Sequence, residues 1–253
     1  MAQLQDKVAI VTGAARGLGR AYAEALAAEG AAILVADLND GADTVAAITA
    51  QGGRAVATTV DVADADSCVA MAAAALEAFG RIDILVNNAA LYAGLKGARF
   101  EHLDEKQWDA AMNVNVKGTW LASRAVVQAM REAGGGSIIN VSSLAAVFGL
   151  PYGLDYVASK AAVIGMTRGM ARELGSDNIR VNAVAPSAVM TEGTEEFFGE
   201  KFEKAKGVIA SGQLIKRNLE PSDVTGTVVY LASDHSALVT GQTHMVDGGS
   251  WFL

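Results

Sequence analysis

Two kinds of hydrophobic pattern alternate along the chain. Short runs of apolar and β-branched residues recur, and most of them are apolar without interruption, which is typical of strands buried on both faces of a parallel sheet. We expect strands at residues 8–11, 32–36, 55–60, 82–86, 137–141, 181–184 and 244–246.

The stretches between these runs carry apolar residues at helical spacing. They predict helices over residues 18–30, 41–50, 65–79, 108–133, 155–174 and 222–231. Strands that alternate with helices in this way predict an α/β fold, with a Rossmann-type doubly wound sheet and helices on both faces. The chain has three prolines and no Ser/Pro-rich linker, so we expect residues 1–253 to form a single domain.

Residues 191–218 interrupt this alternation. The segment is polar and charged, is punctuated by glycine, and contains Phe197, Phe198 and Phe202. Long loops are often functional, so one interpretation is a mobile lid beside a ligand site. The other interpretation is a solvated surface helix whose three phenylalanines face the core.

Composition and charge narrow the class of protein. The net charge is −8 and no basic patch is visible, which argues against nucleic acid as a partner. No apolar run approaches the roughly 20 residues of a membrane span, and the N-terminal residues are too polar for a signal peptide. The single cysteine, Cys68, excludes an internal disulfide and suits a reducing compartment. We therefore expect a cytoplasmic protein, and three scattered histidines give no reason to expect a metal site.

The sequence TGAARGLG at residues 12–19 follows the first expected strand and leads into a helix. Gly13 allows a tight turn, Gly17 lets the backbone approach a pyrophosphate, and Gly19 lets the helix pack close to the strand. The positive end of the helix dipole then faces the phosphates. In this strand–turn–helix context the pattern predicts a dinucleotide site.

The end of the second expected strand bears on the choice of dinucleotide. Asp37 stands where a carboxylate would bind the adenosine ribose hydroxyls of NAD and repel the 2′-phosphate of NADP, and Leu38 follows it. Arg16 complicates the prediction because a basic residue in the glycine turn could attract that phosphate. We favour NAD over NADP, since a carboxylate facing a phosphate is directly repulsive. A helix cap or turn role for Asp37 stays open.

Tyr156 and Lys160 lie four residues apart, on one face of an expected helix. A free phenol has a pKa of about 10 and exchanges protons poorly at neutral pH. A nearby ammonium favours the phenolate, so we expect Lys160 to lower the pKa of Tyr156 and make it a general acid/base. Taken alone, the pair would be interpreted as an ordinary surface pair, because this spacing is common on helix faces. The rest of the chain is what favours the catalytic interpretation.

Together these features resemble the short-chain dehydrogenase/reductase family, in its branch of about 250 residues with TGxxxGxG and YxxxK motifs. The resemblance spans essentially the whole chain. It rests on the residue 12–19 turn, Asp61-Val62, Asn87-Asn88-Ala89-Ala90, Asn115, Ser143, Tyr156 with Lys160, residues 182–186 with Thr191, and Asp247-Gly248-Gly249. It implies seven parallel strands, a homotetramer and a nicotinamide cofactor.

The resemblance also implies roles for individual residues. Asn115, Ser143, Tyr156 and Lys160 form the catalytic set, in which Ser143 binds the substrate oxygen and Asn115 kinks its helix and anchors Lys160 through water. The implied cofactor contacts are Gly13, Arg16, Gly17, Leu18, Gly19, Asp37, Leu38, Asp61, Val62, Asn88, Ala89, Tyr156, Lys160, Pro186, Val189 and Thr191.

The implied substrate contacts are Tyr92, Ser143, Tyr152, Ser187 and Met190. Ser187 stands where the family usually has glycine, so its hydroxyl is either a substrate contact or a tolerated turn residue. The set is mostly apolar with a few hydroxyls, which favours a hydrophobic, cyclic or aromatic secondary alcohol or ketone. An NADPH-dependent 3-oxoacyl reductase and a non-catalytic nucleotide-binding protein on the same fold stay open as alternatives.

Overall fold

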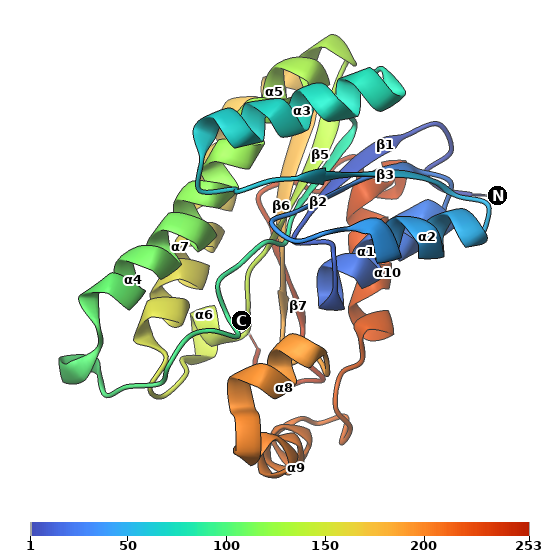
Figure 1. Ribbon diagram of the computed structural model, residues 1–253. Helices are drawn as coiled ribbons and strands as arrows, with labels where there is room; N and C mark the ends of the chain where they lie inside the picture. Colours follow the sequence, from blue (N-terminus) through green and yellow to red (C-terminus); the bar gives the residue numbers. More distant parts are fainter. Residues whose placement is uncertain (1, 253) are drawn as a thin grey trace.

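The computed structural model describes residues 2–252, so Met1 and Leu253, the two ends of the expected domain, lie outside the described residues. Its framework is a seven-stranded, all-parallel sheet with strand order β3-β2-β1-β4-β5-β6-β7 (Figure 1). The strands are β1 Val8–Thr12, β2 Ala32–Asp37, β3 Arg54–Thr59, β4 Ile84–Asn87, β5 Gly136–Val141, β6 Ile179–Pro186 and β7 Thr243–Val246. The expected doubly wound α/β fold is confirmed.

Helices cover both faces of the sheet. One face carries α1 (Gly17–Ala28), α2 (Ala42–Ala50) and α10 (Pro221–Ala232), and the other carries α3 (Ala65–Phe79), α5 (Gly118–Glu132) and α7 (Leu154–Leu174). α4 (Glu105–Met112) packs on α7, and α6 (Ala145–Phe148) is a single turn. Within residues 2–252, no helix is both long and apolar enough to span a membrane.

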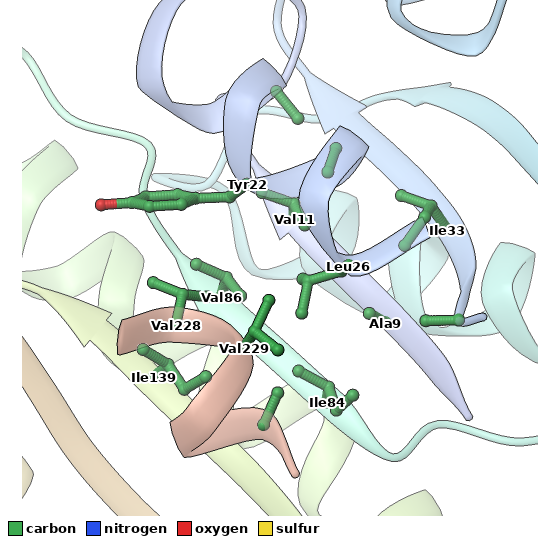
Figure 2. Close-up of a cluster of buried hydrophobic side chains, with 14 of the residues drawn as sticks. Ala9, Val11, Tyr22, Leu26, Ile33, Ile84, Val86, Ile139, Val228 and Val229 are labelled. Carbon is green, nitrogen blue, oxygen red and sulfur yellow. The ribbon is translucent and has the colours of Figure 1, made fainter. Parts of the chain in front are cut away.

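The strands fill two hydrophobic cores because their side chains point alternately to opposite faces. Ala9 and Val11 enter the core under α1 and α10, whereas Ile10 between them enters the core under α3 and α5. Figure 2 shows Tyr22 of α1 and Val229 of α10 gathered over the strand side chains of the first core. Burial on both faces explains why the central strands are apolar at successive positions.

Two expectations about local structure need correction. β3 is not buried on both faces, because it pairs only with β2 at the sheet edge and each of its residues is exposed or half-buried. The helix expected over residues 108–133 is divided, since a π-helical segment, Asn113–Lys117, joins α4 to α5. The π-helical turn contains Asn115, where the resemblance implied a kink.

Residues 191–218 are largely helical rather than a loop. They contain α8 (Glu192–Phe198), a 3₁₀ turn (Gly199–Lys201) and α9 (Phe202–Gly212), which lie together at one end of the molecule in Figure 1. A parallel bridge between Val189 and Leu219 closes the base of this excursion. We call residues 191–218 the lid segment. Further 3₁₀ turns lie at Phe100–His102, Gly175–Asp177 and Asp234–Ser236.

The strand order creates a crevice at the carboxyl edge of the sheet. After β1 the chain builds β2 and β3 on one side, and then crosses to place β4 on the other side of β1. The loops that follow β1 and β4 therefore diverge, and ligands of open α/β sheets bind at such a reversal. The glycine turn follows β1 and Asn88 follows β4, so both lie at this crevice.

Candidate active site

A cavity of about 860 Å³ opens at this crevice. The glycine turn, the ends of β2, β4, β5 and β6, the start of α7 and both lid helices contribute to its walls. Of the sixteen residues expected to contact the cofactor, all line this cavity. In residues 2–252, no three His, Cys, Asp or Glu side chains gather into a group that could hold a metal ion.

The glycine turn is held by contacts that leave no room for larger residues. Asn88 Nδ2 donates to the carbonyls of Thr12 and Gly13, each at 2.9 Å. A Cβ added to Gly19 would lie 2.1 Å from the Gly13 oxygen, and Gly13 itself has a φ of +64°. The side chain of Asn88 therefore fixes the turn from behind.

The first turn of α1 suits an anionic ligand. No side chain caps this helix and its first turn holds no acidic residue, so the positive end of its dipole is not neutralised locally. A Cβ added to Gly17, whose φ is +58°, would meet nothing closer than Thr191 at 3.9 Å. The turn thus presents an open backbone cradle to the cavity, and it fits the pyrophosphate of a dinucleotide.

Asp37 ends β2 beside this cradle and is 9% exposed. Its Oδ2 accepts from the Ala15 amide at 2.9 Å, and its Oδ1 accepts from the Asn39 amide at 2.9 Å. Oδ1 also accepts from Asn39 Nδ2 at 3.1 Å. The turn role is therefore real, and it leaves a lone pair for ribose hydroxyls on Oδ2 rather than on Oδ1. Leu38 beside it is 67% exposed, and Asp61 and Val62 line the same end of the cavity.

Ser143, Tyr156 and Lys160 line the cavity together. Lys160 Nζ donates to the Val141 carbonyl at 2.7 Å and lies 5.8 Å from the centre of the Tyr156 ring. Ser142, which was not predicted, donates from its hydroxyl to the Lys160 carbonyl at 2.8 Å. The end of β5 therefore fixes α7, which carries both Tyr156 and Lys160.

Burial has the largest effect on the pKa values of Tyr156 and Lys160. Burial raises the pKa of Tyr156 to about 12, although the Ser143 hydroxyl acts in the opposite direction. Burial also lowers the pKa of Lys160 to about 8. Burial thus outweighs the other influences on Tyr156 in the protein chain itself, because removal of both groups from water disfavours both charged forms. The expected lowering of the Tyr156 pKa by the Lys160 ammonium stays a prediction.

Asn115 lies behind the cavity wall rather than in it. Its Oδ1 accepts from the Leu91 amide at 2.7 Å, and its Nδ2 donates to the Leu91 carbonyl at 3.2 Å and to the Ser159 hydroxyl at 3.0 Å. The side chain thus ties the loop before Tyr92 to α7. The implied link through water to Lys160 stays a prediction.

Three of the five expected substrate contacts line the cavity: Tyr92, Ser143 and Ser187. The Tyr92 ring stacks on Phe197 of α8, with centroids 4.5 Å apart and planes inclined by 15°, and its centroid lies 5.1 Å from that of Tyr156. An aromatic row therefore runs from Tyr156 to the lid segment.

Tyr152 and Met190 do not line this cavity. Tyr152 has a left-handed backbone, with φ of +66°, and its side chain is 63% exposed before α7 begins. Met190 follows Val189 in extended pairing with Leu219, so their side chains point to opposite sides. Val189 lines the cavity, whereas Met190 lines a separate hollow with Phe202.

Several cavity residues were not anticipated. Phe148 and Leu150 follow β5, Val208 and Ile209 belong to α9, and Ser250 comes from the C-terminal loop. Their residue types match those of ordinary core or surface positions, so the sequence carried no signal that could select them. Their place depends on how the lid segment and the C-terminal loop fold over the sheet.

Comparison with known proteins gives matches along the whole chain. A family model described as enoyl-(acyl carrier protein) reductase matches residues 13–250. D-threitol dehydrogenase of Mycolicibacterium smegmatis is 40% identical over 98% of this chain and 94% of its own length. The 3-oxoacyl-(acyl-carrier-protein) reductase of Thermotoga maritima is 39% identical over 98% of both chains.

Two further matches bear on cofactor and fold. The NAD-dependent glycerol dehydrogenase of Listeria innocua is 36% identical, over 97% of this chain and 94% of its own length. A solved structure from Sinorhizobium meliloti, assigned as a short-chain alcohol dehydrogenase, superimposes with a TM-score of 0.92 at 37% identity. That match covers 98% of this chain and 97% of the other.

Proposed function

Because the chain belongs to the short-chain dehydrogenase/reductase family, a family of oxidoreductases, we propose that it transfers a hydride reversibly between NAD(H) and a secondary alcohol or ketone. One observation carries the proposal. Ser143, Tyr156 and Lys160 line the same cavity as an uncapped helix N-terminus behind a glycine turn. That arrangement supports hydride transfer next to a proton donor.

In this proposal Tyr156 gives a proton to the substrate oxygen or takes it away, as a general acid/base. Ser143 donates a hydrogen bond to the same oxygen and stabilises the charge that develops there. When bound, the oxidised nicotinamide would accept the hydride and would add positive charge beside the phenol. Lys160, with its Nζ 5.8 Å from the centre of the Tyr156 ring, supplies a further positive charge, which favours the phenolate against the effect of burial.

We propose NAD as the cofactor, with NADP less favoured. The Asp37 carboxylate at the adenosine end would accept from ribose hydroxyls and repel a 2′-phosphate. The exposed Leu38 offers that phosphate no positive charge. The NAD dependence of the Listeria innocua relative is consistent with this choice.

The cavity walls support a hydrophobic or cyclic substrate. The charged residues among the described cavity residues are Arg16, Asp37, Asp61 and Lys160, three of which belong to the expected adenosine end. The wall around Tyr156 and the lid segment is apolar and aromatic instead: Tyr92, Phe148, Leu150, Phe197, Phe198 and Ile209. Such a wall favours apolar ketones over polyols of the kind that the threitol and glycerol dehydrogenases oxidise.

An NADPH-dependent 3-oxoacyl reductase is the second candidate, favoured by the Thermotoga maritima relative and by the basic Arg16. Titration of protein fluorescence with NADH and NADPH separates the two candidates. Tight binding of NADPH with weak binding of NADH would favour the reductase. A protein that binds nucleotide but turns over no alcohol or ketone would be the non-catalytic alternative.

The catalytic assignment is tested with Tyr156→Phe, using Tyr152→Phe as a matched control. Turnover of a panel such as cyclohexanol, 1-phenylethanol and glycerol is followed by NADH absorbance. We expect Tyr156→Phe to bind NADH normally and to lose about 10²- to 10⁴-fold in kcat, because the proton donor is gone. Near-native kcat in Tyr156→Phe would contradict the assignment.

We also propose a single catalytic domain that assembles as a homotetramer, with residues 191–218 as its substrate lid. Exposed apolar side chains on the α4–α7 side of the molecule, such as Phe100 at 74% and Trp120 at 48%, suit a partner surface. Light scattering coupled to size-exclusion chromatography measures the assembly. A cytoplasmic location stays a prediction, which cell fractionation tests.

A further inference from the structure

An ion pair joins the glycine turn to the lid segment. The Arg16 guanidinium donates to both carboxylate oxygens of Glu196, from Nη1 at 2.5 Å and from Nη2 at 3.0 Å, across 180 positions of sequence. Both side chains are about half exposed, at 55% and 48%. The two-pronged geometry is the strongest contact that an arginine makes with a carboxylate.

Arg16 lies at the expected adenosine end of the cavity, next to Ala15, whose amide donates to Asp37. Arg16 and Lys160 are the basic residues among the described cavity residues, and Lys160 lies at the catalytic end. The contact with Glu196 raises the pKa of Arg16, and the charges of Glu192 and Asp37 act in the same direction. Arg16 is therefore surrounded by carboxylates close to Asp37, the proposed ribose anchor.

We propose that Glu196 is a specificity-determining residue: its carboxylate pairs with the Arg16 guanidinium and so prevents Arg16 from binding a 2′-phosphate. The inference rests on the proposed preference for NAD and adds a second device to the direct repulsion by Asp37. A phosphate must displace the Glu196 carboxylate to gain Arg16, and it must do so beside the carboxylate of Asp37. Arginine binds phosphate and carboxylate through the same pair of donors, so the two ligands compete.

The test measures the dissociation constants of NADPH and NADH by fluorescence in Glu196→Gln, with Glu196→Ala as a second variant. Glu195→Gln is the matched control, because Glu195 is exposed on the same turn of α8 and does not contact Arg16 in the structure. We expect both Glu196 variants to bind NADPH about three- to tenfold more tightly, the scale of a bidentate but exposed ion pair, with NADH unchanged. In a double variant that carries Glu196→Gln and Arg16→Met, the gain in NADPH affinity should disappear.

Two outcomes would overturn the inference. If a Glu196 variant changes the affinities for NADPH and NADH by the same factor, the ion pair only holds the lid segment in place. If Glu195→Gln changes NADPH affinity as much as Glu196→Gln does, the loss of negative charge alone explains the effect. The wild type tests the proposed function separately. Tighter binding of NADPH than NADH to the wild type would refute the NAD preference. The role of Glu196 would still be judged separately, from the ratio of the NADPH dissociation constants of the variant and the wild type.

Discussion

The rings of Tyr92 and Phe197 stack almost in parallel, with centroids 4.5 Å apart, although one follows β4 and the other belongs to α8. Tyr92 also contacts the Tyr156 ring, so this stack joins the proposed acid/base to the lid segment. Aromatic pairs contribute about 0.5–1.5 kcal/mol beyond the burial of area. The stack is therefore strong enough to influence how a substrate sits beside Tyr156.

We expect Phe197→Ala to raise the KM for a cyclic ketone such as cyclohexanone by about three- to tenfold, with little effect on NADH binding. Steady-state kinetics and NADH titration measure the two effects. Phe100→Ala is the control, because Phe100 is 74% exposed and does not line the cavity. An unchanged KM in Phe197→Ala would show that the stack does not contact the substrate.

Substituting alanine at Gly19 and at Gly226 distinguishes a steric clash from an effect on helix propensity. An added Cβ on Gly19 would lie 2.1 Å from the Gly13 oxygen and 2.4 Å from Asn88 Nδ2, whereas one on Gly226 in α10 would meet nothing within 4 Å. Gly19→Ala must displace the turn, and we expect NADH affinity to fall about tenfold or more.

Gly226→Ala is the matched control, and it should leave NADH affinity unchanged. It should also raise the free energy of unfolding by about 0.5–1 kcal/mol, because alanine is the better helix former. Isothermal titration and urea denaturation measure both quantities. Equal NADH affinities in the two variants would contradict the role of the turn.

Sequence patterns predicted the central sheet and the glycine turn because both depend on local rules. β1 and β2 are apolar at successive positions, and the turn between β1 and α1 needs glycine for its backbone. The same rules failed at β3, since a run of alanine, valine and threonine does not reveal that its strand lies at the sheet edge.

The candidate site was predictable only in part because its finer features depend on contacts between distant segments. Glu196 reaches Arg16 only after the lid segment folds over the turn, and no periodicity in α8 indicates that. The pKa of Tyr156 depends on how much protein surrounds the phenol, which residue spacing does not encode. Tyr152 and Met190 were placed by motif position, whereas backbone direction decides where they point.

Asn115 offers a test of positioning. Its amide bonds Leu91 and Ser159, so Asn115→Ala leaves the Leu91 amide without its partner. We expect the free energy of unfolding to fall by about 1–3 kcal/mol, and kcat to fall because Tyr92 and α7 are no longer held together. Asn113→Ala, an exposed position in the same π-helical segment, should stay within about 0.5 kcal/mol of wild type. Equal losses of stability in the two variants would argue against this role.

Lys160 makes stability depend on pH in a direction that can be stated in advance. Burial lowers its pKa from 10.5 to about 8, so between these values the unfolded chain binds a proton that the folded chain does not. The contribution of Lys160 to the free energy of unfolding therefore increases as the pH rises through this window. That contribution is lost as the pH falls toward 8. From pH 7.5 to 9.5, the wild type should gain about 2 kcal/mol relative to Lys160→Met. Urea denaturation of both proteins at the two pH values measures the difference. If the difference in free energy of unfolding between wild type and Lys160→Met is the same at both pH values, Lys160 keeps its ordinary pKa in the folded protein.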